Sequence, residues 1–448
     1  MTRRPYFGDR SPGRSWVLGF VLVAFLAGSV KVFQRGPRPK FQAGVAASAL
    51  PIDRSPEIPS GLGGSSGVRS EFVSKRKLVR THAACLIELE NRKVRAFWYA
   101  GTDEGTADVT IQTAVLDPDT GSWTPERMVV SRETTQQALF RYVKKVGNPV
   151  VGRAADGSMT LFYVAVSLGG WSGSSITAMT SQDDGETWSQ PRRLITSPFF
   201  NLGTLVKAQP FAYADGTIGL PVHAEFLGKF GEVLNLDAAN NVVDSTRLSS
   251  GRSCLQPVFL VEGENRAVVL MRYAGKERPN RVISTRTSDG GLTWTPPEKL
   301  MLANPNSALS GLMLPDGRIL AALNNNEDNR DALSLVVSDD GGTRWKTIYV
   351  VEDKSEPDWK NPSDNRYSSA IEALAVATNG GTVEAVGYAD SVKRLMGSSK
   401  GWSFEFSYPC LIRTKLGEFH LVYTWNEAFI KHVQFSQAWL DRRMAETK

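Results

Sequence analysis

The sequence has few of the residues that most often bind metals or cross-link a fold. Its 448 residues include only four His and three Cys, and Cys85, Cys254 and Cys410 lie far apart in apolar stretches. An odd number of widely spaced cysteines predicts neither a disulfide framework nor a metal-binding motif. The chain also lacks a phosphate-binding Gly-rich loop and a Gly-x-Ser-x-Gly nucleophile elbow. We therefore predict no metal and no cofactor.

Charge of one sign gathers only at the N-terminus. Residues 1–40 hold eight Lys or Arg and one Asp, so the formal net charge of +6 belongs mostly to this leader. The remainder is close to neutral, which argues against nucleic acid as a partner because such binding needs a basic patch on the folded domain.

The leader contains the one long apolar run, Trp16–Val30, with basic residues on both sides. Its length and flanks predict an apolar helix over 16–30 that acts as a membrane anchor or a cleaved signal. Residues 41–70 are rich in Pro, Gly and Ser, which is typical of a flexible linker. We expect an exported protein whose folded part lies outside the cytoplasm, either membrane-anchored or, after cleavage, secreted.

Long runs with helical periodicity are scarce beyond residue 70, whereas Gly (40), Pro (23) and Trp (11) are plentiful. Short apolar strands alternate with turn residues, which indicates an all-β domain. One turn pattern recurs three times, as Ser181-Gln-Asp-Asp-Gly-Glu-Thr-Trp188, Thr287-Ser-Asp-Gly-Gly-Leu-Thr-Trp294 and Ser338-Asp-Asp-Gly-Gly-Thr-Arg-Trp345. The hydroxyl and the Asp carboxylate can accept backbone N–H bonds, Gly supplies a positive φ, and Trp packs on the sheet.

The spacing of these turns predicts the number of repeats. Degenerate copies are expected at Asp119–Trp123, Asn235–Asn241 and Ser398–Trp402, which gives six turns. Six units of four strands predict an all-β fold, a six-bladed β-propeller over residues 71–440. The motif resembles the Asp box, or BNR repeat, of sialidases, in which it is structural.

The resemblance to the sialidase superfamily extends over nearly all of residues 75–435. Phe406-Ser-Tyr408-Pro resembles the segment with the nucleophilic tyrosine, which implies that role for Tyr408. Sialidases bind a substrate carboxylate with three arginines. Arg272, after an apolar strand, matches the second, and Arg330 matches the third. His82 stands at the position of the first, with Arg80 two residues upstream as a substitute on the same strand face.

The remaining candidates are acids, an amide and His82 itself. His82 is predicted to bind a carboxylate as imidazolium or to act as an acid or base. The Gly-rich loop 101–108 matches the region of the sialidase acid/base, with Asp108 as first choice and Glu104 as second. Gln256 stands where sialidases place the glutamate that assists the tyrosine, and Glu225 is the only candidate to replace it.

Three functions follow from this resemblance. The first is a retaining glycoside hydrolase, with Tyr408 as nucleophile, that acts on a terminal, acidic sugar of a glycan. The second is a non-catalytic carbohydrate-binding propeller. The third is a polysaccharide lyase in which His82 and Tyr408 act as base and acid. A carboxylate within hydrogen-bond reach of the Tyr408 hydroxyl would favour the first.

Overall fold

The computed structural model describes residues 16–25, 38–42, 67–74, 80–197, 201–226, 228–249, 253–359, 366, 369–370, 372–373 and 404–446. Residues 1–39 and 40–448 form separate compact units. The first unit contains a helix over residues 16–25. In the part of the chain described, no helix is long and apolar enough to cross a membrane. The anchor or signal predicted over 16–30 stays a prediction, and residues 26–30 lie outside the described ranges.

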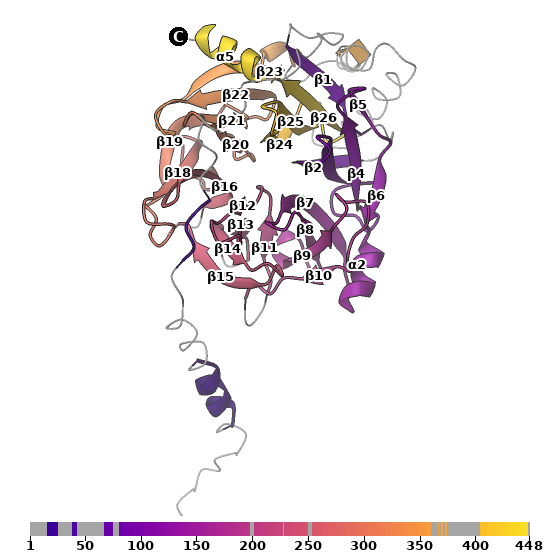
Figure 1. Cartoon of the computed structure of the whole chain (residues 1–448), viewed down its shortest axis with the longest axis vertical. Coiled ribbons are helices and arrows are strands. Elements are labelled where there is room, and N and C mark those ends of the chain that lie inside the picture. The colour runs from indigo at the N-terminus through magenta and orange to yellow at the C-terminus, as the bar shows by residue number, and fades with distance from the viewer. Residues whose placement is uncertain are drawn as a thin grey trace, which may run out of the picture. The chain divides into compact units, whose positions relative to one another are not determined.

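The second unit is a ring of six antiparallel sheets, which confirms the predicted six-bladed propeller (Figure 1). Blades one and two contain β2 (Arg80–Glu88), β3 (Val94–Gly101), β4 (Thr110–Asp117), β5 (Ser122–Trp123) and β6 (Arg127–Val130), then, after α2 (Arg132–Leu139), β7 (Lys145–Arg153), β8 (Met159–Val166), β9 (Ser174–Ser181) and β10 (Arg192–Arg193). Blades three and four contain β11 (Thr204–Val206), β12 (Phe211–Ala212), β13 (Ile218–Ala224), β14 (Phe230–Leu236) and β15 (Val242–Arg247), then β16 (Cys254–Gly263), β17 (Arg266–Tyr273), β18 (Arg281–Thr287) and β19 (Glu298–Ala303).

Blades five and six complete the ring. They contain β20 (Ser310–Met313), β21 (Ile319–Leu323), β22 (Ala332–Ser338) and β23 (Lys346–Asp353), then, after a short 3₁₀ turn η3 (Pro357–Trp359), β24 (Phe406–Arg413), β25 (Phe419–Trp425) and β26 (Phe429–Phe435). A second 3₁₀ turn, η2 (Trp171–Gly173), joins β8 to β9, and α5 (Gln437–Glu446) follows the last blade.

The fourth strand of blade six comes from the other end of the domain. β1 (Val68–Phe72) pairs with β26 in antiparallel register from Val68 opposite Phe435 to Phe72 opposite Lys431. The ring therefore starts three residues before the expected residue 71. Within the predicted linker, Phe41 is buried and stacks on Tyr213 of blade three, with ring centroids 5.6 Å apart. The pairing of β1 with β26 closes the ring and leaves fewer unpaired strand edges.

The three full Asp boxes form the turns between the third and fourth strands of blades two, four and five. In the first, the Ser181 hydroxyl accepts the Gly185 N–H at 2.8 Å and Asp183 accepts the Thr187 N–H at 2.8 Å. The Trp188 indole donates to the Gly185 carbonyl. Bonds from Thr187 and Ser181 hold the pKa of Asp183 at about 2. This carboxylate stabilises the turn and serves no acid/base chemistry.

Two of the three degenerate boxes occupy the same place in their blades. Asp237 accepts backbone N–H bonds from Ala239 and Asn241 between β14 and β15, and Asp117 accepts them from Asp119 and Thr120 between β4 and β5. The copy predicted at 398–402 lies outside the described residues. Blade six needs no such turn, because its fourth strand is β1.

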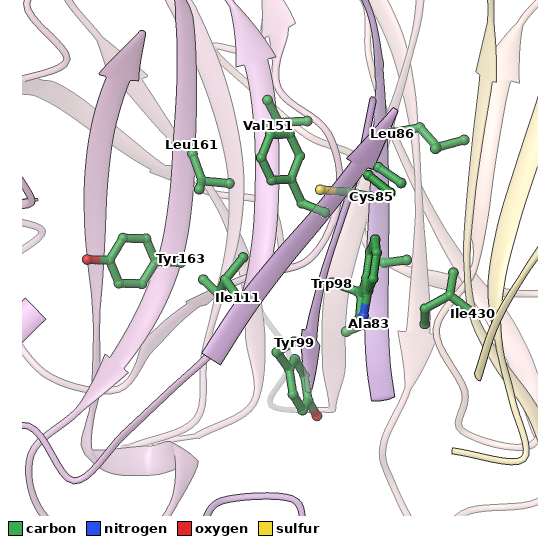
Figure 2. Close-up of a cluster of buried hydrophobic side chains, with 14 of the residues drawn as sticks. Ala83, Cys85, Leu86, Trp98, Tyr99, Ile111, Val151, Leu161, Tyr163 and Ile430 are labelled. Atoms are coloured by element: carbon green, nitrogen blue, oxygen red, sulfur yellow. The ribbon is translucent and has the colours of Figure 1, made fainter. Parts of the chain in front are cut away.

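The core lies between adjacent sheets, where apolar faces of neighbouring blades pack together. Figure 2 shows one such cluster, in which Trp98 and Ile111 of blade one meet Val151 and Leu161 of blade two. β3 and β8 are buried along their whole length because both of their faces are covered. Burial of these side chains supplies the main stabilisation of the ring.

The innermost strands share a distortion that positions the site. In β2, β7, β16 and β24, two residues oppose one on the next strand, and the first of the two has a left-handed φ between 46° and 56°. These left-handed residues are Ala83, Asn148, Gln256 and Tyr408. Non-glycine residues held in this region cost about 1–3 kcal/mol each and cluster at functional sites. The repeated bulge lies a few residues after the start of each of these four strands.

Candidate functional site

The candidate site residues come from equivalent places in different blades. They lie at the start of an innermost strand, in the links between blades that lead into one, at the end of a second strand, or in the link from the second strand to the third. Because the strands alternate in direction, these places share one end of the ring. This end of the ring is therefore the place where a ligand would meet residues of several blades.

His82 and Tyr408 form the centre of this group. Their ring centroids are 4.3 Å apart with planes tilted by 58°, and the Tyr99 ring lies edge-on to His82 at 5.6 Å. His82 is 5% exposed, whereas Tyr408 is only partly buried. The structure therefore brings together two residues that are 326 positions apart and that the sequence singled out separately.

The protonation state of His82 follows from its surroundings. Burial lowers the pKa of its imidazole to about 4, against the opposing charges of Glu104 and Glu405, while Arg330 and Arg80 lower it further. The ring is neutral at ordinary pH. Binding of a carboxylate by His82 as imidazolium, one of the expected roles, is thus confined to pH values near or below 4.

The two predicted arginines are joined by Asn306, which the sequence analysis did not identify. Its side-chain carbonyl accepts the Arg272 Nε–H at 2.5 Å, and its backbone carbonyl accepts from Arg330 Nη2 at 3.1 Å. Asn306 has a left-handed φ of 57°. Arg272 Nη1 also donates to the side-chain oxygen of Gln256 at 3.4 Å. Gln256 therefore supports an arginine of the pair.

Glu405 is an acid of this group that sequence reasoning missed. It directly precedes β24, and its carboxylate pairs with Arg330 at 2.9 Å. Burial raises its pKa, but Arg330 and His82 outweigh that effect and hold the pKa below its usual value. Glu405 stays ionised. Its position three residues before Tyr408 could have identified it from sequence, because both residues lie at the start of the innermost strand of blade six.

Glu104 reaches the group from the β3–β4 link. Its carboxylate accepts the Trp171 indole N–H at 3.1 Å, and its charge acts on His82, Tyr99 and Lys145. The Lys145 ammonium lies 3.7 Å from the centre of the Trp171 ring. Trp171 and Lys145 were not predicted, because neither belongs to a recognisable motif.

Asp108 and Arg80 are held by other partners. The Asp108 carboxylate accepts bonds from Thr102 and Thr106 of its own turn. Burial raises its pKa, but these bonds outweigh it and keep the pKa below the ordinary value, which is unfavourable for a general acid. Arg80 forms ion pairs with Asp103 and Glu427. Its guanidinium is thus paired with two carboxylates, whereas that of Arg330 is paired with one, Glu405.

Glu225 pairs with His223 on the blade-three side of the site, with Oε1 and Nε2 3.4 Å apart. The hydrogen bond from His223 lowers the pKa of Glu225, and the charge of Arg272 acts in the same direction.

The surroundings of Tyr408 include the buried Lys207. Its ammonium donates to the Pro409 carbonyl at 3.0 Å and lies 5.8 Å from the centre of the Tyr408 ring. Among the described residues, no carboxylate hydrogen-bonds the Tyr408 hydroxyl, and no group of three or more His, Cys, Asp or Glu is placed to hold a metal ion.

Comparison with known proteins assigns the family. The profile described as "BNR repeat-like domain" matches residues 92–421, well over half of the chain. The chain belongs to the BNR repeat-like domain family. No curated protein matches the sequence.

Solved structures agree with the fold of this BNR repeat-like protein. The Hadza microbial sialidase Hz136 is similar at 14% identity and a TM-score of 0.58, covering 80% of this chain and 66% of that one, so the chain spans just under two thirds of its length. A protein of unknown function from Dyadobacter fermentans is similar at 14% identity and TM-score 0.58 (83% and 100% covered), and an α-L-arabinanase from Penicillium chrysogenum at 13% and 0.54 (83% and 98%). At such identities the likeness establishes the propeller fold alone and leaves the chemistry to the site.

Proposed function

We propose that this BNR repeat-like protein is a retaining glycoside hydrolase that cleaves a terminal, acidic sugar from a glycan. The observation that carries the proposal is the linkage of Arg272 and Arg330 through Asn306, next to the contact between His82 and Tyr408. Two guanidinium groups from different blades offer several N–H donors to one carboxylate. A substrate carboxylate bound there would compete with Glu405 and lie close to Tyr408.

Tyr408 is the proposed nucleophile. Its oxygen attacks the anomeric carbon while the bond to the leaving oxygen breaks, and Glu104 donates a proton to that oxygen. The phenol proton passes to His82, whose ring is neutral above pH 4 and whose protonated form Glu104 and Glu405 stabilise. Water, deprotonated by Glu104, then displaces Tyr408, and His82 returns its proton to the departing phenolate. The sugar is released with its configuration retained, and all three side chains regain their starting protonation. A neutral tyrosine suits an anomeric carbon that already carries a carboxylate, since it avoids repulsion between like charges.

A polysaccharide lyase is the second candidate, and the same contact favours it. A neutral His82 could remove the proton next to a uronate carboxylate neutralised by Arg272 and Arg330. Tyr408 would then protonate the leaving oxygen as the sugar gains a double bond. The absence of a carboxylate hydrogen bond to Tyr408 among the described residues is compatible with either path, because such bonds often form only with substrate present.

Product analysis tests these proposals. The full-length protein is incubated with fluorogenic glycosides of acidic and neutral sugars and, separately, with polygalacturonate. Release of fluorophore from acidic glycosides alone supports the hydrolase, and ultraviolet absorbance of an unsaturated sugar supports the lyase. Binding of acidic sugars with neither product would establish the non-catalytic propeller and overturn the hydrolase.

We also propose export of the folded propeller, supported by the basic leader and its apolar run at 16–30. The N-terminal 70 residues fused to a reporter enzyme that is active only outside the cytoplasm test this directly. We expect reporter activity from this fusion and none after Leu22→Arg, which interrupts the apolar run. Equal activity of the two fusions contradicts export by this segment.

A further inference from the structure

Three large apolar side chains are exposed on blade two beside the candidate site. Phe140 is 96% exposed, Tyr142 60% and Leu168 73%. Tyr142 and Leu168 flank the point where β7 and β8 begin to pair, since the Lys144 N–H donates to the Val166 carbonyl. Exposed apolar side chains that gather in one place mark interaction surfaces more often than single ones do. We call Phe140, Tyr142, Lys144 and Leu168 the blade-two rim.

The backbone at Phe140 is strained for no gain in packing. It caps the C-terminus of α2 with φ 49° and ψ 41°, and its N–H donates to the carbonyls of Gln136 and Gln137. Glycine or asparagine adopts this conformation at lower cost, and a bulky residue rarely occupies it. The Gln136 side chain also accepts the Val143 N–H, so the segment after the helix is fixed. An aromatic ring that projects into solvent from a fixed backbone fits contact with a ligand better than it fits stabilisation of the fold.

The rim is continuous with the candidate site. The Lys144 ammonium donates to the Gly169 carbonyl, which joins the segment after α2 to the β8–β9 link. The next residue, Lys145, lies against Trp171, and Trp171 donates to Glu104. Lys145 lies five positions after Phe140, a span of at most about 17 Å. This distance suits a few sugar units that continue from one bound at the axis.

The segment between Glu133 and Asp156 carries cations only. Residues 134–155 contain Arg141, Lys144, Lys145 and Arg153 but no Asp or Glu. Arg153 pairs with Asp184 at the Asp-box end of the blade, and Lys145 is buried against Trp171. Arg141 and Lys144 are therefore the accessible cations of this segment at the end with the rim. Cations next to exposed aromatic rings match a ligand with both carboxylates and apolar sugar faces.

We propose that the blade-two rim binds the continuing chain of a carboxylated polysaccharide whose terminal sugar occupies the site at His82, Tyr408 and the two arginines. The ring of Phe140 and that of Tyr142 stack on sugar faces, and Lys144 pairs with a carboxylate one or more units from the cleaved bond. This inference identifies the substrate class of the proposed hydrolase and rests on that function for the position of the terminal sugar.

Affinity electrophoresis of the full-length protein tests the rim without relying on catalysis. Gels contain polygalacturonate as the carboxylated probe, dextran sulfate as a sulfated one, or neutral dextran. We expect polygalacturonate to retard the wild type, and Phe140→Gly, Tyr142→Ala and Lys144→Ala each to weaken binding about three- to tenfold. Phe140→Gly should leave Tm unchanged or raise it, since it relieves the strained backbone. Matched controls are Met301→Ala and Lys346→Ala, which change exposed residues of β19 and β23.

The outcomes separate the rim from the catalytic proposal. Retardation that survives in Tyr408→Phe but weakens in the rim variants supports the rim even where no hydrolysis occurs. Equal retardation of wild type and rim variants by polygalacturonate contradicts it, as does the absence of retardation. Retardation by dextran sulfate alone would contradict a carboxylated ligand, and equal retardation by neutral dextran would contradict a charged one.

Discussion

The ring of His82 lies 4.3 Å from that of Tyr408, in a place where burial keeps the imidazole neutral. If neutral His82 accepts the phenol proton, activity must fall when the ring is protonated. Because the pKa of His82 is about 4, kcat/KM should fall as the pH drops through about 4 rather than near the ordinary value of 6.5. The pH profile of kcat/KM measures this. An acid limb near 6.5 would contradict the assignment.

Substitution of the same residue should give a large kinetic effect. We expect His82→Gln to lower kcat/KM by about 10²- to 10³-fold at pH 7. His432 provides a matched control, because it is also buried with a pKa lowered to about 4 but lies in β26, against Trp123 and His420. His432→Gln should retain wild-type kcat/KM per folded molecule. Equal losses in both variants would indicate a structural effect.

Removal of the Asn306 side chain should separate the two arginines. Asn306→Gly keeps the left-handed backbone favourable and deletes the acceptor of Arg272. We expect KM for an acidic glycoside to rise about tenfold or more, while binding of the neutral sugar stays weak and unchanged. Asn240→Gly is the control, since Asn240 is also left-handed but lies in the β14–β15 turn. An unchanged KM in Asn306→Gly excludes Asn306 from carboxylate binding.

Acid should destabilise the fold through its buried histidines. His82 and His432 both have a folded-state pKa of about 4, below the ordinary 6.5 of an unfolded chain. The unfolded chain therefore takes up these protons first, so the stabilisation is fully present above pH 6.5 and is lost as the pH falls through about 4. Each histidine contributes up to about 3 kcal/mol to this loss. Urea unfolding between pH 7 and 4 should show a steeper decline in the wild type than in His432→Gln, and parallel curves would contradict the assignment.

The absence of a side chain at Gly147 leaves room for the Trp171 ring. A Cβ at position 147 would lie 2.8 Å from the Trp171 ring, so Gly147→Ala must displace the indole that binds Glu104. We expect a drop of about tenfold or more in kcat, with little change in Tm. Gly263→Ala is the control because no atom lies within 4 Å of its added Cβ. Wild-type kcat in Gly147→Ala would show that Trp171 does not position Glu104.

The sequence predicted the fold better than it predicted the site. The Asp boxes are local, since Ser181, Asp183 and Gly185 bond one another, so their pattern is legible in one short segment. The site depends on closure of the ring, which places Asn306 against Arg272 and Arg330 and brings Glu405 to Arg330. The spacing of these residues along the chain does not predict that they contact one another.

One available signal for the site was left unused. Proline follows the left-handed residue in three innermost strands, at positions 149, 257 and 409. Proline inside a strand marks an edge or a bulge, because it has no N–H to donate to a neighbouring strand. Asn148, Gln256 and Tyr408 could therefore have been grouped from sequence as equivalent positions around the axis.

The most direct test of the hydrolase is the turnover of an acidic glycoside by Tyr408→Phe, compared with Tyr349→Phe on the outer strand β23. Loss of the hydroxyl removes the nucleophile and leaves the ring that contacts His82. We predict a fall in kcat of at least about 10³-fold in Tyr408→Phe and wild-type turnover in the control. Turnover by Tyr408→Phe within tenfold of the wild type would contradict the proposal that Tyr408 forms the covalent bond to the sugar.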